Sequence, residues 1–201
     1  ALSSGALPSA VAVVRVSGPS TRHVLKLLAN QIPKPRKMTL IKIQTAEHEV
    51  IDISLVCFFP KAESITGEDL AEFHVHGSVA VVEELYLALA TISDVRPAEP
   101  GEFTRRSLNN GKMDLTEVEA LSDLIAAETG EQRKQSLRQL SGELSTKYEE
   151  WRKRLIRIRA KMEAILDFSD EESETFDDFF ATSEDFSVNS KNYSPVFRSK
   201  F

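Results

Sequence analysis

Residues 69–92, DLAEFHVHGSVAVVEELYLALATI, decide the fold that we expect for this chain. Residues 69–76 alternate between apolar and polar side chains, which is typical of a β-strand with one face on a core. Apolar side chains then recur at spacings of three and four through residues 78–92, which predicts an amphipathic helix. A strand that leads directly into a helix indicates that helices pack on a sheet.

The same succession of strand and helix occurs nearer the start of the chain. Residues 11–17, VAVVRVS, are rich in β-branched side chains, and Gly18-Pro19 then allow a helix to begin with Pro in its first turn. This helix is expected over residues 19–29. Further strands are predicted over residues 38–45 and 50–59, and a further helix over residues 102–109. We therefore predict an α+β domain over residues 1–113, with a mixed sheet and packed helices.

After residue 113 the apolar pattern becomes purely helical. Asp114 and Glu117 form a start that resembles a capping box, and an apolar helical stripe follows them. A second stripe, at spacings of three and four, runs from Leu137 to Ile165 and predicts one long helix with a bundle or coiled-coil seam. Residues 114–168 are therefore expected to form a truncated helical domain.

Charge is strongly segregated in this chain, whose net charge is −6. Residues 133–161 contain ten Lys or Arg and three Glu, whereas residues 167–186 contain nine Asp or Glu and no basic residue. Any nucleic-acid contact is therefore expected in the first stretch and not in the second. We predict that residues 169–201 are a disordered, acidic, Phe-rich tail, in which the amphipathic stretch 176–180 could bind a partner.

Composition also excludes two classes of protein. No apolar run approaches the roughly 18–20 residues that a membrane-spanning helix needs, so we expect no membrane partner. The single cysteine, Cys57, excludes an internal disulfide framework. Because Cys57 shares an alternating apolar strand face with Ile53 and Leu55, we predict that it is a core residue.

Polar side chains interrupt two of the predicted strands. Arg15 shares a strand face with Val11 and Val13, so it either meets an anion there or reaches solvent from the strand end. Glu72, His74 and His76 point to one side of the strand over residues 69–76. Such a set suits a divalent metal site, a polar pocket in which Glu72 accepts hydrogen bonds from a heterocyclic ligand, or a half-exposed polar face.

A third candidate lies in the loop before residue 114. Lys112 follows Gly111 next to a predicted helix start, where the helix dipole and the ammonium would both favour a carboxylate-bearing ligand. An ordinary solvated loop is the alternative. The sequence contains neither a G-x-x-x-x-G-K-[ST] loop nor a G-x-G-x-x-G motif, so P-loop and Rossmann nucleotide sites are not supported.

Four strings together resemble the MnmE/TrmE family. They are VAVVRVSGP at residues 11–19, SITGEDLAEFHVHG at 64–77, RPAEPGEFTRRSLNNGKMDLTEVEALSDLIAAET at 96–129 and AILDFSDEE at 164–172. Their order and spacing are those of the family, over about residues 6–172. The HVHG and EFTRR forms are most similar to the mitochondrial members, which are GTP-binding protein 3-like.

The resemblance implies a folate-binding and dimerising N-terminal domain in a protein that modifies C5 of the wobble uridine of tRNA. The implied cofactor is 5-formyltetrahydrofolate, and the implied binding residues are Arg15, Glu72 and Lys112, with Arg105 and Arg106 as secondary contributors. The implied partners are a second copy of the chain, an MnmG/GidA-type protein and tRNA, in the mitochondrion. GTP, Mg²⁺ and K⁺ would belong to a GTPase domain that this sequence does not include, so we expect no catalytic residue here.

Two alternatives remain open from the sequence. The chain could be a folate-dependent one-carbon transferase of aminomethyltransferase type, which would show turnover. It could also be a non-catalytic module whose basic residues 133–161 bind tRNA or a protein helix, with salt-dependent affinity.

Overall fold

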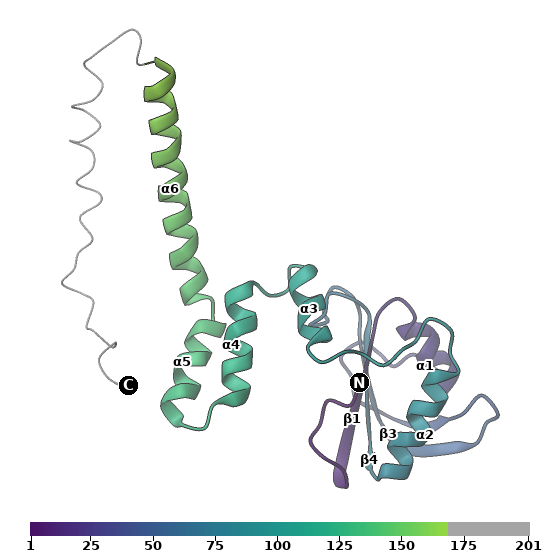
Figure 1. Cartoon of the computed structure of the whole chain (residues 1–201). Coiled ribbons are helices and arrows are strands. Elements are labelled where there is room, and N and C mark those ends of the chain that lie inside the picture. Colours follow the sequence, from purple (N-terminus) through teal and green to yellow (C-terminus); the bar gives the residue numbers. More distant parts are fainter. Residues whose placement is uncertain (169–201) are drawn as a thin grey trace. The chain divides into compact units, whose positions relative to one another are not determined.

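The computed structural model describes residues 1–168, and the predicted acidic tail, residues 169–201, lies outside the described residues. Four strands and six helices follow one another in this part of the chain (Figure 1). They are β1 (Ser9–Ser17), α1 (Thr21–Ala29), β2 (Thr39–Gln44), β3 (Val50–Phe59), β4 (Leu70–Gly77), α2 (Val79–Ala90), α3 (Glu102–Asn109), α4 (Leu115–Ala126), α5 (Gly130–Leu140) and α6 (Glu143–Phe168).

The strands form one sheet in the order β1-β4-β3-β2, which confirms the α+β class. The sheet differs from the predicted mixed arrangement, because each pair of neighbouring strands is antiparallel. A strand-helix-strand unit gives a parallel pair only when its two strands become neighbours. Here β1 and β2 lie at opposite edges, and the turn between β2 and β3 is short enough to require a hairpin.

Helices α1 and α2 cover the same face of the sheet (Figure 1). The side chains between the helices and the sheet are almost completely buried and apolar. The core includes Val14 from β1, Ile43 from β2, Val56 and Phe58 from β3, Phe73 and Val75 from β4, Leu25 from α1 and Leu85 from α2. Burying each of the larger side chains stabilises the fold by roughly 1.5–3 kcal/mol.

The other face of the sheet is not covered by these helices, and it carries exposed apolar side chains together with Glu72 and His74 of β4. Leu40 and Leu55 are cross-strand neighbours on this face, and they are 66% and 42% exposed. Val11 and Ile53 on the same face are also exposed. The apolar residues whose alternation predicted β3, such as Ile53 and Leu55, therefore lie on this uncovered face, and β3 contributes Val56 and Phe58 from its other face to the core. We call this surface the open face.

The start of α4 agrees with the sequence. The Asp114 carboxylate accepts a hydrogen bond from the Glu117 backbone N–H at 2.9 Å, and the Glu117 carboxylate accepts one from the Asp114 N–H at 2.8 Å. This reciprocal pair is a capping box, which satisfies N–H groups that lack partners in the first turn. The predicted helix over residues 102–109 is also confirmed, as α3.

The single long helix predicted from Leu137 to Ile165 is wrong, because it is divided into α5 and α6. Helix α5 ends at Leu140, and Gly142 has φ of 82°, in the left-handed region that favours glycine. The N–H groups of Ser141 and Gly142 donate to the carbonyls of Leu137 and Gln139, which closes the helix end. The apolar spacing continues across this break, so periodicity alone missed it.

The chain divides into two compact units, the first of which is Ala1–Glu143, while the second begins at Leu144 and contains most of α6. Within residues 1–168, no helix is both long and apolar enough to span a membrane.

Candidate functional site

Arg15 and Glu72 are brought together by the pairing of β1 with β4. The two residues are direct partners in the strand register, although 57 positions separate them in the sequence. Arg15 Nε donates to Glu72 Oε1 at 2.8 Å, so the anion that Arg15 requires is Glu72. The second carboxylate oxygen, Oε2, lies 3.2 Å from His74 Nε2.

The pair keeps unused hydrogen-bonding capacity. The Arg15 and Glu72 side chains are 34% and 16% exposed, so both are partly withdrawn from water while remaining accessible. Within residues 1–168, no hydrogen bond occupies the two terminal amino groups of the Arg15 guanidinium. A planar guanidinium with free amino groups can bind a carboxylate or carbonyl oxygen of a ligand.

A pocket of about 160 Å³ opens beside Arg15. It lies between the end of β1, the start of α1 and the segment that leads into α3. Tyr86 and Phe103 supply aromatic walls, and Arg106 supplies a second cation. Glu72 is not among the lining residues, so it stands behind Arg15 and not in the pocket wall. Small-molecule sites usually enclose about 300–1,000 Å³, so this pocket can hold only part of a ligand the size of a folate.

The loop over residues 60–69 joins the end of β1 to α3. Ser17 Oγ lies 2.7 Å from Thr66 Oγ1 and donates to Glu68 Oε2 at 3.1 Å. The same Glu68 oxygen accepts from Arg106 at 2.8 Å, and Ser107 donates to the Ile65 carbonyl at 2.7 Å. These bonds hold the pocket residue Arg106 in place. Residues 64–69, SITGED, therefore stabilise the position of the pocket wall at Arg106.

Lys112 is held by the same loop but not by the Arg15–Glu72 pair. Its ammonium donates to the Ala62 carbonyl at 2.8 Å. The loop approaches closely at Gly67, where an added Cβ would lie 2.6 Å from the Asn110 Cβ. Lys112 does not line the pocket beside Arg15. The structure thus unites two of the three predicted binding residues and places the third on a neighbouring loop.

Glu102 is a buried carboxylate that sequence reasoning missed. Its side chain is 3% exposed and receives a bidentate pair from Arg96, at 2.9 and 2.7 Å, together with a bond from Arg106 at 2.7 Å. The hydrogen bonds from Arg96 and then Arg106, helped by the Glu99 N–H, lower the pKa of Glu102 to about 2. An acidic residue in a first helical turn, four residues before an arginine, was the signal available in EFTRR.

The two arginines of EFTRR have different surroundings. Arg106 lines the pocket and bonds to Glu68 and Glu102. Arg105 forms an exposed pair with Glu99 at 3.0 Å and is not a pocket residue. Of the two predicted secondary contributors, only Arg106 is therefore placed near Arg15.

His74 and His76 contact different carboxylates. His74 contacts Glu72, whereas the His76 Nδ1 lies 2.8 Å from Asp52 Oδ1. Burial alone would raise the pKa of Asp52, but its hydrogen bonds with the His76 backbone and ring outweigh burial and lower it. Within residues 1–168, no three His, Cys, Asp or Glu side chains are grouped to hold a metal ion.

Cys57 lies beside Glu72 in the strand register and is 3% exposed, which confirms its prediction as a buried residue. Burial, and then the nearby Glu72 carboxylate, raise the pKa of its thiol. A raised pKa keeps the sulfur as a thiol, which is the less reactive form.

Comparison with known proteins assigns both parts of the chain to one class. Residues 1–112 match the family model described as GTP-binding protein TrmE N-terminus, and residues 115–191 match the MnmE helical domain. The fold and the site therefore define a TrmE-type N-terminal domain that is followed by a helical domain. The second match extends beyond residue 172, where the family resemblance was expected to end.

Individual relatives agree with this class. The proteins named tRNA modification GTPase MnmE from Rhodopseudomonas palustris, Brucella canis and a Bradyrhizobium species are 52%, 53% and 51% identical over 171 residues. Each alignment covers 85% of this chain but only 37–39% of the relative. The chain belongs to the MnmE/TrmE family and spans less than half the length of these members.

Proposed function

We propose that this chain is the 5-formyltetrahydrofolate-binding and dimerisation portion of a tRNA modification GTPase that acts on C5 of the wobble uridine. The observation that supports this proposal most is the Arg15–Glu72 pair, whose charged atoms are 2.8 Å apart and of which Arg15 lines a pocket. These are two of the three positions at which the sequence resembles the folate-contacting residues of the family.

The chemistry of the three residues suits a reduced folate. The Glu72 carboxylate can accept hydrogen bonds from N–H donors of the pterin ring, and the free amino groups of Arg15 can bind a carbonyl or carboxylate oxygen. Lys112 would supply a further cation after exchanging its bond to the Ala62 carbonyl for one to the ligand. In the proposed reaction the folate supplies a one-carbon unit, while these residues bind and orient it.

Dimerisation is supported by the open face. Its exposed residues Leu40, Ile53 and Leu55 lie on the neighbouring strands β2 and β3, and Val11 lies on β1, across β4, which carries Glu72 on the same face. A stable interface usually buries about 800 Å² on each partner. Because the pocket in one chain is small for a folate, a second chain on the open face would also enlarge the site.

Calorimetric titration with 5-formyltetrahydrofolate tests the folate proposal. We expect saturable binding that weakens about 10- to 150-fold in Arg15→Gln and Glu72→Gln, because one charged hydrogen bond is worth about 1.5–3 kcal/mol. Arg105→Gln is the matched control, since it removes a nearby arginine that does not line the pocket. Absence of binding by folded wild-type protein would overturn the proposal.

Sedimentation velocity tests the dimer. Leu40→Glu and Leu55→Glu place charges on the open face and should convert the protein to a monomer. Leu87→Glu is a matched control, because Leu87 is 63% exposed but belongs to α2, on the other side of the sheet. A dimer that survives both open-face substitutions would exclude this surface as the interface.

The remaining parts of the proposal concern the whole system. We propose an MnmG/GidA-type partner, tRNA as the substrate and a mitochondrial location, on the basis of the sequence resemblance. Mass spectrometry of wobble-uridine nucleosides from mitochondrial tRNA, with and without the gene, tests substrate and location together. Unchanged modification in mitochondrial tRNA would contradict both.

A further inference from the structure

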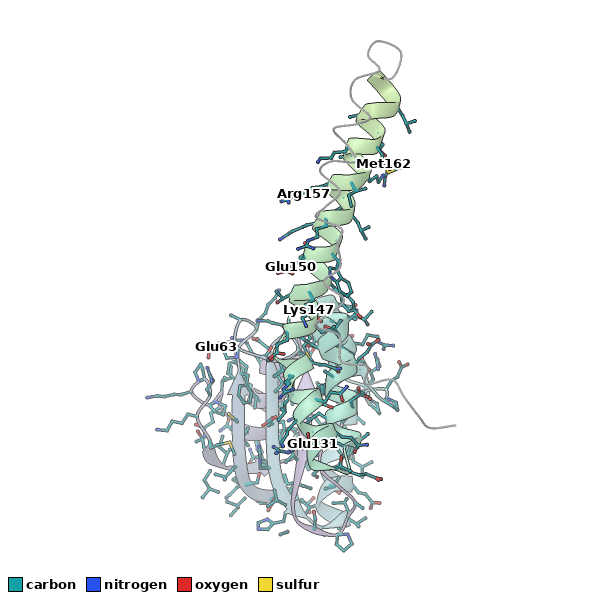
Figure 2. All side chains as sticks on the ribbon, turned by 90° about the vertical axis from the view of Figure 1, so that its left-hand side faces the viewer. Glu63, Glu131, Lys147, Glu150, Arg157 and Met162 are labelled. Carbon is teal, nitrogen blue, oxygen red and sulfur yellow. The ribbon has the colours of Figure 1, made fainter. Side chains whose placement is uncertain are left out.

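The Glu72 carboxylate is held on the open face of the sheet by two neighbours, one for each of its oxygens. Arg15 Nε, from β1, donates to Oε1 at 2.8 Å, and His74 Nε2, from β4 itself, lies 3.2 Å from Oε2. Glu72 and His74 are two positions apart on one strand, so their side chains point to the same side of the sheet. Figure 2 views the sheet from this side, away from α1 and α2.

The direction of the His74 hydrogen bond follows from the chemistry of its partner. An ionised carboxylate only accepts hydrogen bonds, so His74 Nε2 carries the proton and donates it to Glu72. The two side chains are 26% and 16% exposed, so water competes only in part for this bond. In the strand register His74 is flanked by Val13 on β1 and Leu55 on β3. Because both flanking side chains are apolar, Glu72 is the group that orients the ring.

The two bonds leave a defined set of acceptor positions on Glu72. A carboxylate has about four lone-pair sites, two on each oxygen. Within residues 1–168, Arg15 and His74 occupy one site on each oxygen, so one site on each oxygen is left for a ligand. A ligand with two adjacent N–H donors can then bind both oxygens at once.

Such a bidentate contact requires a carboxylate plane that does not rotate. The terminal torsion of a glutamate side chain has only shallow preferences, so a carboxylate that is held at one oxygen can still turn about its last bond. Arg15 alone would leave Glu72 in that condition. The second bond, from His74 to Oε2, fixes the plane.

We propose that His74 is a positioning residue, which fixes the Glu72 carboxylate for a ligand with two adjacent N–H donors. This inference rests on the proposed function, because the aminopyrimidinone ring of a pterin is such a ligand. Arg15 lines the pocket and keeps amino groups for the ligand, whereas His74 does not line the pocket and uses its ring proton on Glu72. His74 therefore acts through Glu72.

His76 provides a matched control. It lies on the same strand, two positions after His74, but it contacts a different carboxylate. Its backbone N–H donates to Asp52 Oδ2 at 2.9 Å, its ring Nδ1 lies 2.8 Å from Asp52 Oδ1, and its side chain is 72% exposed. Loss of the His76 ring should therefore leave Glu72 in place.

Calorimetric titration of the full chain with 5-formyltetrahydrofolate tests the role in binding. His74→Leu should weaken binding about 3- to 10-fold, as expected for the loss of one hydrogen bond. His74→Gln should keep most of the affinity, because its side-chain amide retains an N–H donor. His76→Leu should bind like the wild type. Urea unfolding and sedimentation velocity check that each variant keeps its fold and its association state.

A double-mutant cycle tests whether His74 acts through Glu72. In a Glu72→Ala background, His74→Leu should change folate affinity less than twofold, because the carboxylate that His74 positions is absent. A general effect of His74 on packing of the sheet would instead weaken binding by the same factor in both backgrounds. Additive losses would therefore overturn the positioning role.

Nitrogen-15 NMR of the histidine rings tests the contact without any ligand. At about pH 8, where an ordinary histidine is neutral, the ring shifts show which nitrogen carries the proton. We expect Nε2 of His74 to carry it in the wild type, and a mixture of the two tautomers in Glu72→Ala, because the hydrogen bonds of the ring set the position of the proton. A tautomer that is the same in both proteins would contradict the contact.

The outcomes separate this inference from the proposed function. If folate does not bind the wild type while NMR shows the His74–Glu72 bond, the folate site and the role of His74 in it are overturned, and the bond remains. If folate binds the wild type and His74→Leu equally, the positioning role is overturned and the folate site remains. If His74→Leu loses affinity only because its dimer dissociates, the effect belongs to the interface, which also overturns the positioning role.

Discussion

Ser54 and Ser107 are two buried serines for which the structure predicts opposite effects of the same substitution. Ser54 lies on β3, toward the helices, and is 4% exposed. Within residues 1–168, its Oγ is the buried side-chain atom without a hydrogen-bond partner. Ser107 lies on α3, is 3% exposed, and donates from Oγ to the Ile65 carbonyl at 2.7 Å.

The expected changes in the free energy of unfolding follow from these partners. An unpaired buried hydroxyl costs about 1–3 kcal/mol, whereas a void of roughly 10–15 Å³ left by one oxygen costs about 0.3 kcal/mol. Ser54→Ala should therefore stabilise the protein by about 1–2 kcal/mol. Ser107→Ala loses a hydrogen bond worth about 1 kcal/mol and regains about 0.5 kcal/mol of helix propensity, so it should destabilise.

Urea unfolding followed by far-ultraviolet circular dichroism measures both variants. We expect the midpoint to rise for Ser54→Ala and to fall for Ser107→Ala, with an unchanged slope, which indicates the same exposed surface on unfolding. A Ser54→Ala variant that is less stable than the wild type would show that this hydroxyl has a partner in solution. The reasoning about the β3 core would then be refuted.

Three further substitutions test the structure elsewhere. The pKa of Glu102 is lowered to about 2 from 4.5, so its carboxylate contributes stability that is complete above pH 4.5 and is lost as the pH falls toward 2. In urea unfolding from pH 2 to 7, the free energy of unfolding of Glu102→Gln should therefore fall less between pH 4.5 and 2 than that of the wild type. Gly77→Ala should destabilise by about 1–3 kcal/mol, because its Cβ would lie 2.3 Å from the Ser9 carbonyl oxygen; an unchanged thermal midpoint would contradict this contact. Asp114→Ala removes the cap of α4 and should cost about 0.5–2 kcal/mol, seen as faster amide hydrogen exchange in that helix only.

Much of the local structure could be predicted because its causes are local. Alternation and helical spacing placed all four strands and the helices α1 to α3 close to their observed positions. The cap at Asp114 was predictable, since a capping box involves residues only three positions apart. The break at Gly142 was missed because the apolar spacing is continuous across it, although a glycine there was a visible signal.

The candidate site was predicted residue by residue but not as an arrangement. Arg15 and Glu72 were each recognised as a charged residue on an apolar strand, but the local sequence of neither strand predicts that the two residues pair. Lys112 was expected beside them, and the structure instead bonds it to the loop carbonyl of Ala62. The buried Glu102 cluster was not predicted at all, because its partner Arg96 lies in a segment without periodic structure.

The sequence by itself determined the class of the fold, the four strands and the helices α1 to α4, and the family to which the chain belongs. Only the tertiary structure decided the strand order, the face of β3 that the helices cover, and the meeting of Arg15 with Glu72. The physical reason is the range of the interactions. Periodicity and capping act over a few residues and leave a local pattern, whereas strand order and register arise from contacts between distant segments that compete for one core.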